Sequence, residues 1–137
     1  MVKVIQDVWI ITENGINVFS RLHDESLNEQ LFGALMSALN SFAEEIAKGG
    51  LSNFQLSDKR FSIIKRNQFI FVASSNPKVK EKKAISELEI IIKMFFNKFP
   101  HDLLDTWDSD VNIFKGFEQN IEDSLENTID KFKQAFW

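Results

Sequence analysis

The chain has 137 residues, enough for one domain with a hydrophobic core, and its composition (44% hydrophobic, 26% charged) is ordinary for a globular protein. A net charge of -4 argues against a nucleic-acid-binding protein, because neutralising phosphates needs a surplus of Lys and Arg on one surface. The absence of cysteine excludes disulfides and thiolate metal sites.

A β-hairpin is predicted at the start of the chain. Residues 4–12 are rich in β-branched and aromatic side chains, residues 16–22 alternate between apolar and polar ones, and the Glu-Asn-Gly segment at 13–15 supplies a turn. Large apolar side chains fall on both faces of the first strand, as Trp9 and Ile10 illustrate. This two-sided pattern predicts a central strand that is covered on both sides.

One long helix is predicted after the hairpin. Ser26 and Glu29 form a capping box at its start, and Gly49-Gly50 ends it, because glycine enters the left-handed cap conformation without cost. Apolar side chains recur at helical spacing between these limits and form one stripe: Leu31, Leu35, Ala38, Leu39, Phe42 and Ile46.

Three more strands are predicted at residues 51–56, 61–66 and 68–73. Residues 57–60 form the first turn between them, and Asn67 forms the second. Connections as short as these favour an antiparallel meander.

Two helices are predicted in the C-terminal part. Asn76 caps the first of them, with Pro77 at its first helical position, and Pro100 stops it. A broad apolar face, typical of a well-buried helix, is formed by Ile85, Leu88, Ile91, Ile92, Phe95, Phe96 and Phe99. After a polar, acidic loop, the last helix is predicted from an apolar spacing that continues from Phe114 to Phe136.

This order of elements, ββαβββαα with two-sided apolar central strands, resembles that of the longin domain. The resemblance covers roughly residues 3–127 and rests on element order and apolar pattern. It implies an α+β fold, a five-stranded antiparallel sheet with one helix on one face and two helices on the other. We expect residues 1–137 to form a single longin-like domain, with the last helix extended beyond about residue 127.

The resemblance also implies a function in protein binding. Longin domains carry no catalytic signature, and their relatives serve in vesicle-trafficking SNAREs, adaptor small subunits, the signal-recognition-particle receptor and tethering complexes that act on Ras-like GTPases. The longer last helix, and the lack of a SNARE heptad segment after it, depart from a complete longin SNARE. The PAS fold has a similar ββ-then-βββ plan, but it usually inserts several short helices where this chain has one long helix.

Partner-binding residues are predicted beside the first long helix. Phe32 and Met36 lie off its main stripe, and their neighbour in a longin sheet is the edge strand that contains Leu51, Phe54 and Leu56. An exposed edge offers unpaired amides and carbonyls to an added strand, and Met suits adaptable surfaces. In longin relatives the groove between this helix and this edge strand receives partner segments. Ordinary core packing is the competing interpretation.

A basic patch is predicted at the start of the second long helix. Lys78, Lys80, Lys82 and Lys83 gather where the helix macrodipole disfavours cations, which can reflect selection for an anionic partner such as a lipid surface. Glu81 interrupts the patch, and a plain solvated face is the competing interpretation.

The acidic loop between the last two helices gives a weak metal-binding pattern. Asp108, Asp110 and Asn112 occupy the first, third and fifth places of a Ca²⁺ loop, but Ile113 stands where that loop needs Gly, and the last place lacks the bidentate Glu. Capping of the last helix by Ser109 or Asp110 is the better interpretation, and no metal site is predicted.

No catalytic site is predicted. His23 and His101 are the only histidines, and neither has a second histidine within helical reach. The sequence contains no GxxxxGK[ST] or GxGxxG phosphate loop, no GxSxG elbow and no HExxH. We therefore expect a protein that is not an enzyme and needs no cofactor. A small enzyme without a recognised motif is a third possibility, which a buried carboxylate or histidine with a strongly shifted pKa would indicate.

The resulting hypothesis is a cytoplasmic module that binds a Ras-like small GTPase or another trafficking protein, with a peripheral position at a membrane surface as a further expectation. The N-terminus lacks the apolar core of a signal peptide, and no apolar run is long enough to span a bilayer. Formation of a homodimer, through the last helix or through paired strand edges, is a further hypothesis. The alternative is a PAS-like sensor that holds a small ligand in an internal cavity lined by Phe side chains.

Overall fold

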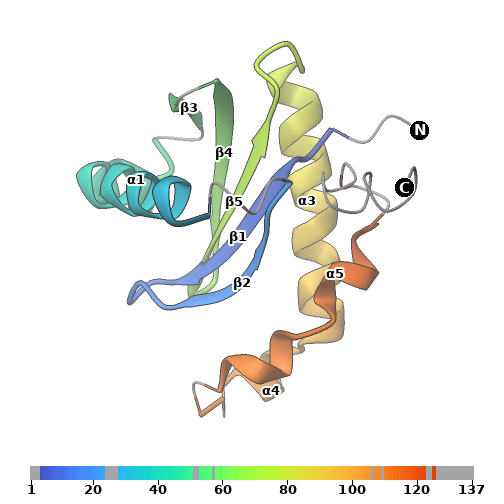
Figure 1. Cartoon of the computed structure of the whole chain (residues 1–137). Helices are drawn as coiled ribbons and strands as arrows, with labels where there is room; N and C mark the ends of the chain where they lie inside the picture. The colour runs from blue at the N-terminus through green and yellow to red at the C-terminus, as the bar shows by residue number, and fades with distance from the viewer. Residues whose placement is uncertain are drawn as a thin grey trace.

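The computed structural model describes residues 4–23, 28–50, 53–56, 58–105, 107–108, 110–122 and 125. Its helices and strands are arranged around a single sheet (Figure 1). Their bounds are β1 Asp7–Thr12, β2 Asn17–Arg21, α1 Asn28–Ser41, α2 Ala43–Ala47, β3 Asn53–Leu56, β4 Lys59–Arg66, β5 Phe69–Ser75, α3 Glu81–Lys98, α4 His101–Asp105, the 3-10 helix η2 Val111–Phe114, and α5 Phe117–Asn120.

The five strands form one antiparallel sheet in the order β2-β1-β5-β4-β3, which confirms the predicted sheet. β1 lies between β2 and β5, and all of its residues are buried, as its two-sided apolar pattern predicts. The pairing with β5 sets Val8 opposite Ala73 and Ile10 opposite Phe71. β2 and β3 are the edge strands.

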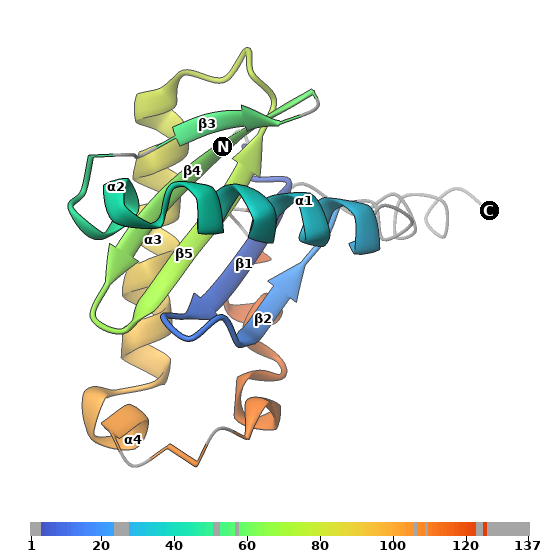
Figure 2. The same cartoon turned by 90° about the vertical axis from the view of Figure 1, so that its left-hand side faces the viewer.

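The sheet separates two hydrophobic clusters. Figure 2 shows α1 and α2 across one face, with α3 behind the other. Because successive side chains of a strand point to opposite faces, β1 contributes to both clusters. Trp9 packs in the cluster that contains Leu35 and Leu39 of α1, whereas its neighbour Ile10 packs in the cluster that contains Leu88 of α3.

Aromatic rings fill the α3 side of the sheet. Phe95 of α3 is completely buried at the centre of this cluster. Its ring centroid lies 5.1 to 5.6 Å from those of Phe69, Phe71, Phe96, Phe99, Phe114 and Phe117. Separations of this size are those of rings in direct contact, so sheet and helix are joined by packed side chains.

The first predicted helix is divided in two. Phe42, with φ of -111° and ψ of 20°, separates α1 from α2. The predicted glycine end is confirmed, because Gly49 has a left-handed φ of 75° and the Gly50 N–H donates to the Glu45 carbonyl at 2.7 Å. The predicted capping residue Ser26 lies outside the described residues.

The second predicted helix begins later than expected. The prediction that Asn76 caps a helix at Pro77 is wrong, because α3 begins at Glu81. The side chain and the carbonyl of Asn76 are used in a turn instead: Oδ1 accepts from the Lys78 N–H at 2.9 Å, and the carbonyl accepts from the Val79 N–H at 2.9 Å. The helix ends at Lys98, just before the predicted stop at Pro100.

The prediction of one continuous last helix is wrong over residues 111–122. The chain forms η2 and then the single turn α5, and Gly116 separates them with a left-handed φ of 87°. A residue in this conformation interrupts a right-handed helix. The interruption lets both Phe114 and Phe117 enter the cluster around Phe95.

The neighbouring C-terminal segments also differ from the prediction. The short helix α4 occupies part of the predicted loop. Leu125 is buried and pairs with Ile5 in an isolated parallel bridge. The predicted helical extension over residues 126–137 lies outside the described residues.

Candidate interaction surface

The principal candidate site is a groove beside α1, which we call the α1 groove. It lies between α1, α2 and the β1–β2 turn, and its volume is about 610 Å³. Its apolar lining includes the buried side chains of Ile11, Leu39 and Ile46 and the half-buried side chains of Met36 and Ile70. An apolar lining of this kind that opens to solvent is suited to receive side chains of another molecule.

One wall of the α1 groove is the β1–β2 turn. Gly15 adopts a φ of 90°, which favours glycine, and its N–H donates to the Thr12 carbonyl at 2.9 Å. The Thr12 hydroxyl accepts from the Ile16 N–H at 3.0 Å and stabilises the same turn. A Cβ atom at Gly15 would lie 3.8 Å from Met36 Cε, so the turn and α1 face each other closely.

The rim of the α1 groove is polar. Glu13 and Lys65 form an ion pair at 2.7 Å, with side chains that are 43% and 31% exposed. A pair this exposed contributes little to stability, because solvent screens it. Ser37 and Asn40 are exposed on the α1 side of the rim. The arrangement of apolar centre and polar rim is the one found in protein-binding surfaces.

Met36 is a predicted partner-binding residue that lines the α1 groove. Phe54 is half-buried in β3, where its ring stacks on Phe61 with centroids 5.2 Å apart and planes at 11°. It does not line the groove. The side chains of three predicted members lie outside the described part of the structure: Phe32, Leu51 and Leu56. A surface shared by α1 and the β3 edge therefore stays a prediction.

The contribution of residues 12–15 to the site was not predicted. The Asn14-Gly15 pair correctly predicts a turn, and Gly15 has the expected positive φ. Nothing local in the sequence indicates that α1 crosses the sheet beside this turn, because that arrangement depends on packing between segments far apart in the chain.

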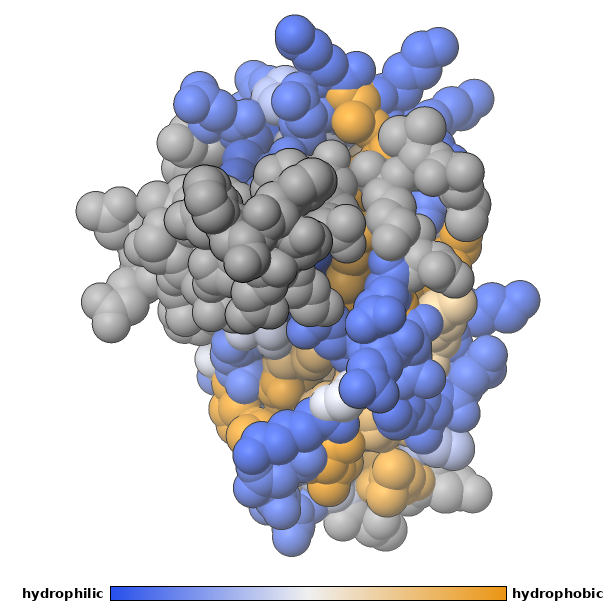
Figure 3. Space-filling view, turned by 45° about the vertical axis from the view of Figure 1, so that its right-hand side comes forward, coloured by the Kyte–Doolittle hydropathy of each residue, from blue (hydrophilic) through white to orange (hydrophobic). Residues whose placement is uncertain are grey.

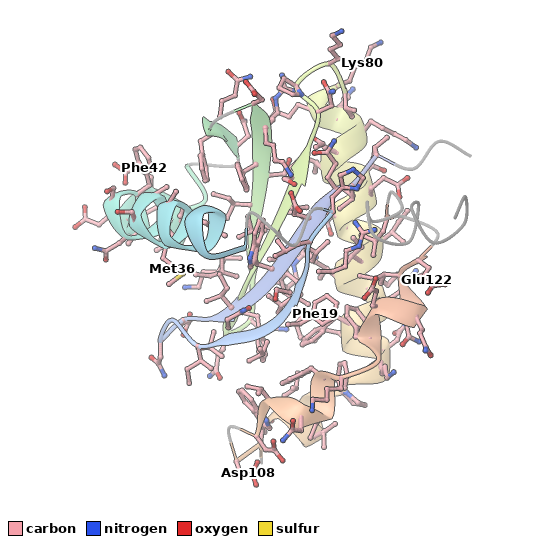
Figure 4. The ribbon with its side chains drawn as sticks, viewed as in Figure 1. Phe19, Met36, Phe42, Lys80, Asp108 and Glu122 are labelled. Carbon is pink, nitrogen blue, oxygen red and sulfur yellow. The ribbon has the colours of Figure 1, made fainter. Side chains whose placement is uncertain are left out.

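The predicted basic patch lies at the end of the molecule where α3 begins. Figure 4 shows Lys80 there, and all four lysines of the patch are exposed. Lys78 and Lys80 precede α3, whereas Lys82 and Lys83 lie in its first turn. Lys83 pairs with Glu87 at 3.1 Å. Within the described residues the other three lysines make no ion pair, so their charges face solvent.

A buried polar cluster lies at the opposite end of β1 from the α1 groove. The Asp7 carboxylate is completely buried and accepts from the Ser74 hydroxyl, the Lys59 ammonium group and the His23 N–H, the last at 2.8 Å. These bonds join β1, β4 and β5 to the residues that follow β2. With its oxygens occupied and no exposed surface, Asp7 connects strands rather than facing a substrate.

The acidic loop contains a capping residue. Asp110 accepts from the Asn112 N–H at 3.0 Å and caps η2, which confirms the capping interpretation for this residue. Asp108 in turn accepts from the Asp110 N–H at 3.1 Å. In the described part of the chain, no group of three or more His, Asp or Glu side chains is placed to hold a metal ion.

No protein-family model matches the chain, and a search of curated proteins finds no match. The helices of the described residues are all too short or too polar to cross a membrane. The function is therefore inferred from the fold and from the α1 groove.

Proposed function

We propose that this protein is a non-catalytic, longin-like interaction module that binds a Ras-like small GTPase or another trafficking protein through the α1 groove. The observation that carries the proposal is an open, apolar groove along the first long helix, with Met36 in its wall. The sheet order β2-β1-β5-β4-β3, with α1 and α3 on opposite faces, supports the longin resemblance on which the partner class rests (Figures 1 and 2).

The groove has the properties of a docking site. Its apolar side chains would lose contact with water on binding, which is the main favourable term in most associations. The Glu13–Lys65 pair and the exposed polar side chains of α1 remain at the rim, where they contribute more to orientation than to affinity.

Such a module needs no catalytic side chain of its own. A protein that binds one nucleotide state of a GTPase more tightly than another shifts the partner toward that state by the difference in affinity. The GTPase supplies the catalytic site, and the α1 groove supplies the binding energy.

The proposal is tested first by affinity capture from the native lysate, in parallel with GDP, a GTP analogue or EDTA. We expect a small GTPase to be recovered preferentially in one nucleotide state. The captured GTPase is then purified, and its affinity is measured against two variants. Ser37→Arg places a long cation at the groove, while Ser41→Arg places the same side chain at an exposed position of α1 outside the groove.

Ser37→Arg is expected to weaken binding by about tenfold or more, because a partner that enters the groove past this rim position must displace the long side chain and desolvate its charge. Ser41→Arg is expected to bind like the original protein. Equal affinity of both variants for the GTPase, at unchanged thermal stability, would contradict docking at the α1 groove. Failure to recover any GTPase or trafficking protein would contradict the partner class.

A ligand sensor of PAS type is the second candidate. The observation in its favour is that the molecule holds cavities of about 600 Å³, a size that accommodates a small molecule. Against it, the interior of the α3 side is filled by the aromatic rings around Phe95, and Glu13, Asn14 and Gly15, which line the groove, are exposed. A small molecule that co-purifies with the protein in native mass spectrometry would favour this second candidate.

A further inference from the structure

A second cavity lies at the same end of the sheet as the α1 groove but on the α3 side. Its volume is about 590 Å³, it is open to solvent, and it is lined by residues of the β1–β2 turn, the β4–β5 turn, α3 and α4, together with Trp107. Figure 3 shows apolar side chains gathered at this end of the molecule, opposite the end where α3 begins. We call this site the Trp107 cavity.

Aromatic rings form one side of the Trp107 cavity. The centroid of Phe69 lies 6.5 Å from that of Trp107 and 6.3 Å from that of Phe96, and all three residues line the cavity. The indole is held in place, because Nε1 of Trp107 donates to the Asp110 carbonyl at 2.9 Å and the ring meets Phe114 edge-on at 5.3 Å. A half-buried indole fixed in this way offers a preformed π-surface.

The polar side chains that line the cavity among the described residues are hydroxyl, amide and carboxylate groups, and none of these described lining residues is Lys, Arg or His. Two carboxylates contribute, from Glu13 and Asp105. Glu13 is paired with Lys65. Asp105 is exposed and makes no ion pair within the described residues, so its negative charge remains available to a ligand.

We propose that the Trp107 cavity binds a small organic ammonium ion. The cation lies over the aromatic face of Trp107, which attracts positive charge through the ring quadrupole, and Asp105 supplies the counter-charge. The apolar part of the ligand packs against Phe96 and Leu104. The Trp107 cavity and the α1 groove share Thr12, Glu13 and Asn14 of the β1–β2 turn, but they lie on opposite faces of the sheet, and the residues of the proposed cation site (Trp107, Asp105, Phe96 and Leu104) do not line the groove.

The proposal is tested with choline as the probe and 3,3-dimethylbutan-1-ol, its neutral isostere, as the matched control ligand. Binding is followed by the indole N–H resonance of Trp107 in nitrogen-15 NMR spectra, identified by its loss in Trp107→Phe. We expect choline to shift this resonance and to bind about tenfold or more tightly than the neutral alcohol. n-Butylammonium, tested in parallel, tells whether the methyl groups or the N–H donors of the cation are recognised.

Two protein variants complete the test. Asp105→Asn is expected to weaken choline binding by about tenfold and to leave the affinity for the neutral alcohol unchanged. Asp58→Asn removes the same charge from an exposed turn outside the cavity and is expected to change neither. The proposal is overturned if neither cation binds, if the neutral alcohol binds as tightly as choline, or if Asp105→Asn and Asp58→Asn have equal effects.

Discussion

At the scale of single residues, the buried carboxylate of Asp7 needs partners for its charge and its oxygens. A carboxylate without exposed surface is stable only when its charge is paired and its oxygens accept hydrogen bonds. Lys59, Ser74 and the His23 N–H provide these interactions, and they come from segments far apart in the chain. The cluster is therefore a feature of the tertiary structure, and Asp7 belongs neither to the α1 groove nor to the basic patch.

Replacement of this carboxylate tests the cluster directly. Asp7→Ala leaves the Lys59 ammonium group, the Ser74 hydroxyl and the His23 N–H without their acceptor, and we expect the free energy of unfolding to fall by about 3–5 kcal/mol. Asp58→Ala, at an exposed position next to Lys59, should change it by less than about 0.5 kcal/mol. Urea denaturation measures both, and a loss below about 1 kcal/mol for Asp7→Ala would show that the buried pair is dispensable.

At the scale of helices and strands, one glycine explains why the last predicted helix fails. Apolar residues from Phe114 onward have helical spacing, but Gly116 has a φ of 87° and divides η2 from α5. Both Phe114 and Phe117 are then buried against Phe95. Burial of two large rings outweighs the modest gain from continuing a helix, since helical propensities amount to a fraction of a kcal/mol per residue.

Substitution of two glycines tests this explanation, because Gly116 has a left-handed backbone conformation and Gly33 lies within a helix. Gly116→Ala forces an L side chain into the left-handed region and should lower the free energy of unfolding by about 1–2 kcal/mol. Gly33→Ala lies in α1 with open space around the added Cβ, so it should raise that free energy by about 0.5–1 kcal/mol. Effects of the same sign in urea denaturation would contradict the assigned backbone conformations.

At the scale of the whole molecule, charge is distributed unevenly. The net charge is -4, yet the basic patch of Lys78, Lys80, Lys82 and Lys83 concentrates positive charge where α3 begins. Figure 3 shows hydrophilic side chains projecting from this end, while apolar ones gather at the other end. An anionic surface would therefore attract one end of the molecule and orient it, even though the protein as a whole is acidic.

The attraction of the basic patch to an anionic membrane is measured by co-sedimentation of the protein with phosphatidylserine vesicles at low salt. Each exposed lysine contributes about 1 kcal/mol near such a surface, so replacement of Lys78, Lys80 and Lys82 by Ser should lower partitioning by about 100-fold. The matched control replaces three exposed lysines elsewhere: Lys48, Lys93 and Lys115. Equal losses in the two triple variants would mean that net charge, rather than the patch, drives binding.

The sequence by itself determined the elements whose signals are local. Alternating apolar residues specified the strands, Asn14-Gly15 and Gly49-Gly50 specified a turn and a helix end, and the two-sided apolar pattern of residues 8–11 specified a central strand. These signals work because backbone conformation and side-chain direction depend mainly on residues a few positions apart.

The tertiary structure alone decided which elements meet. The sheet order, the Asp7 cluster and the Trp107 cavity each join segments that are distant in sequence. The α1 groove required the β1–β2 turn to lie beside Met36, a contact that neither the local sequence pattern nor the longin resemblance indicated. Local patterns indicate which face of a helix or strand is apolar. Which residues cover that face depends on the packing of the whole chain, because many weak contacts form together.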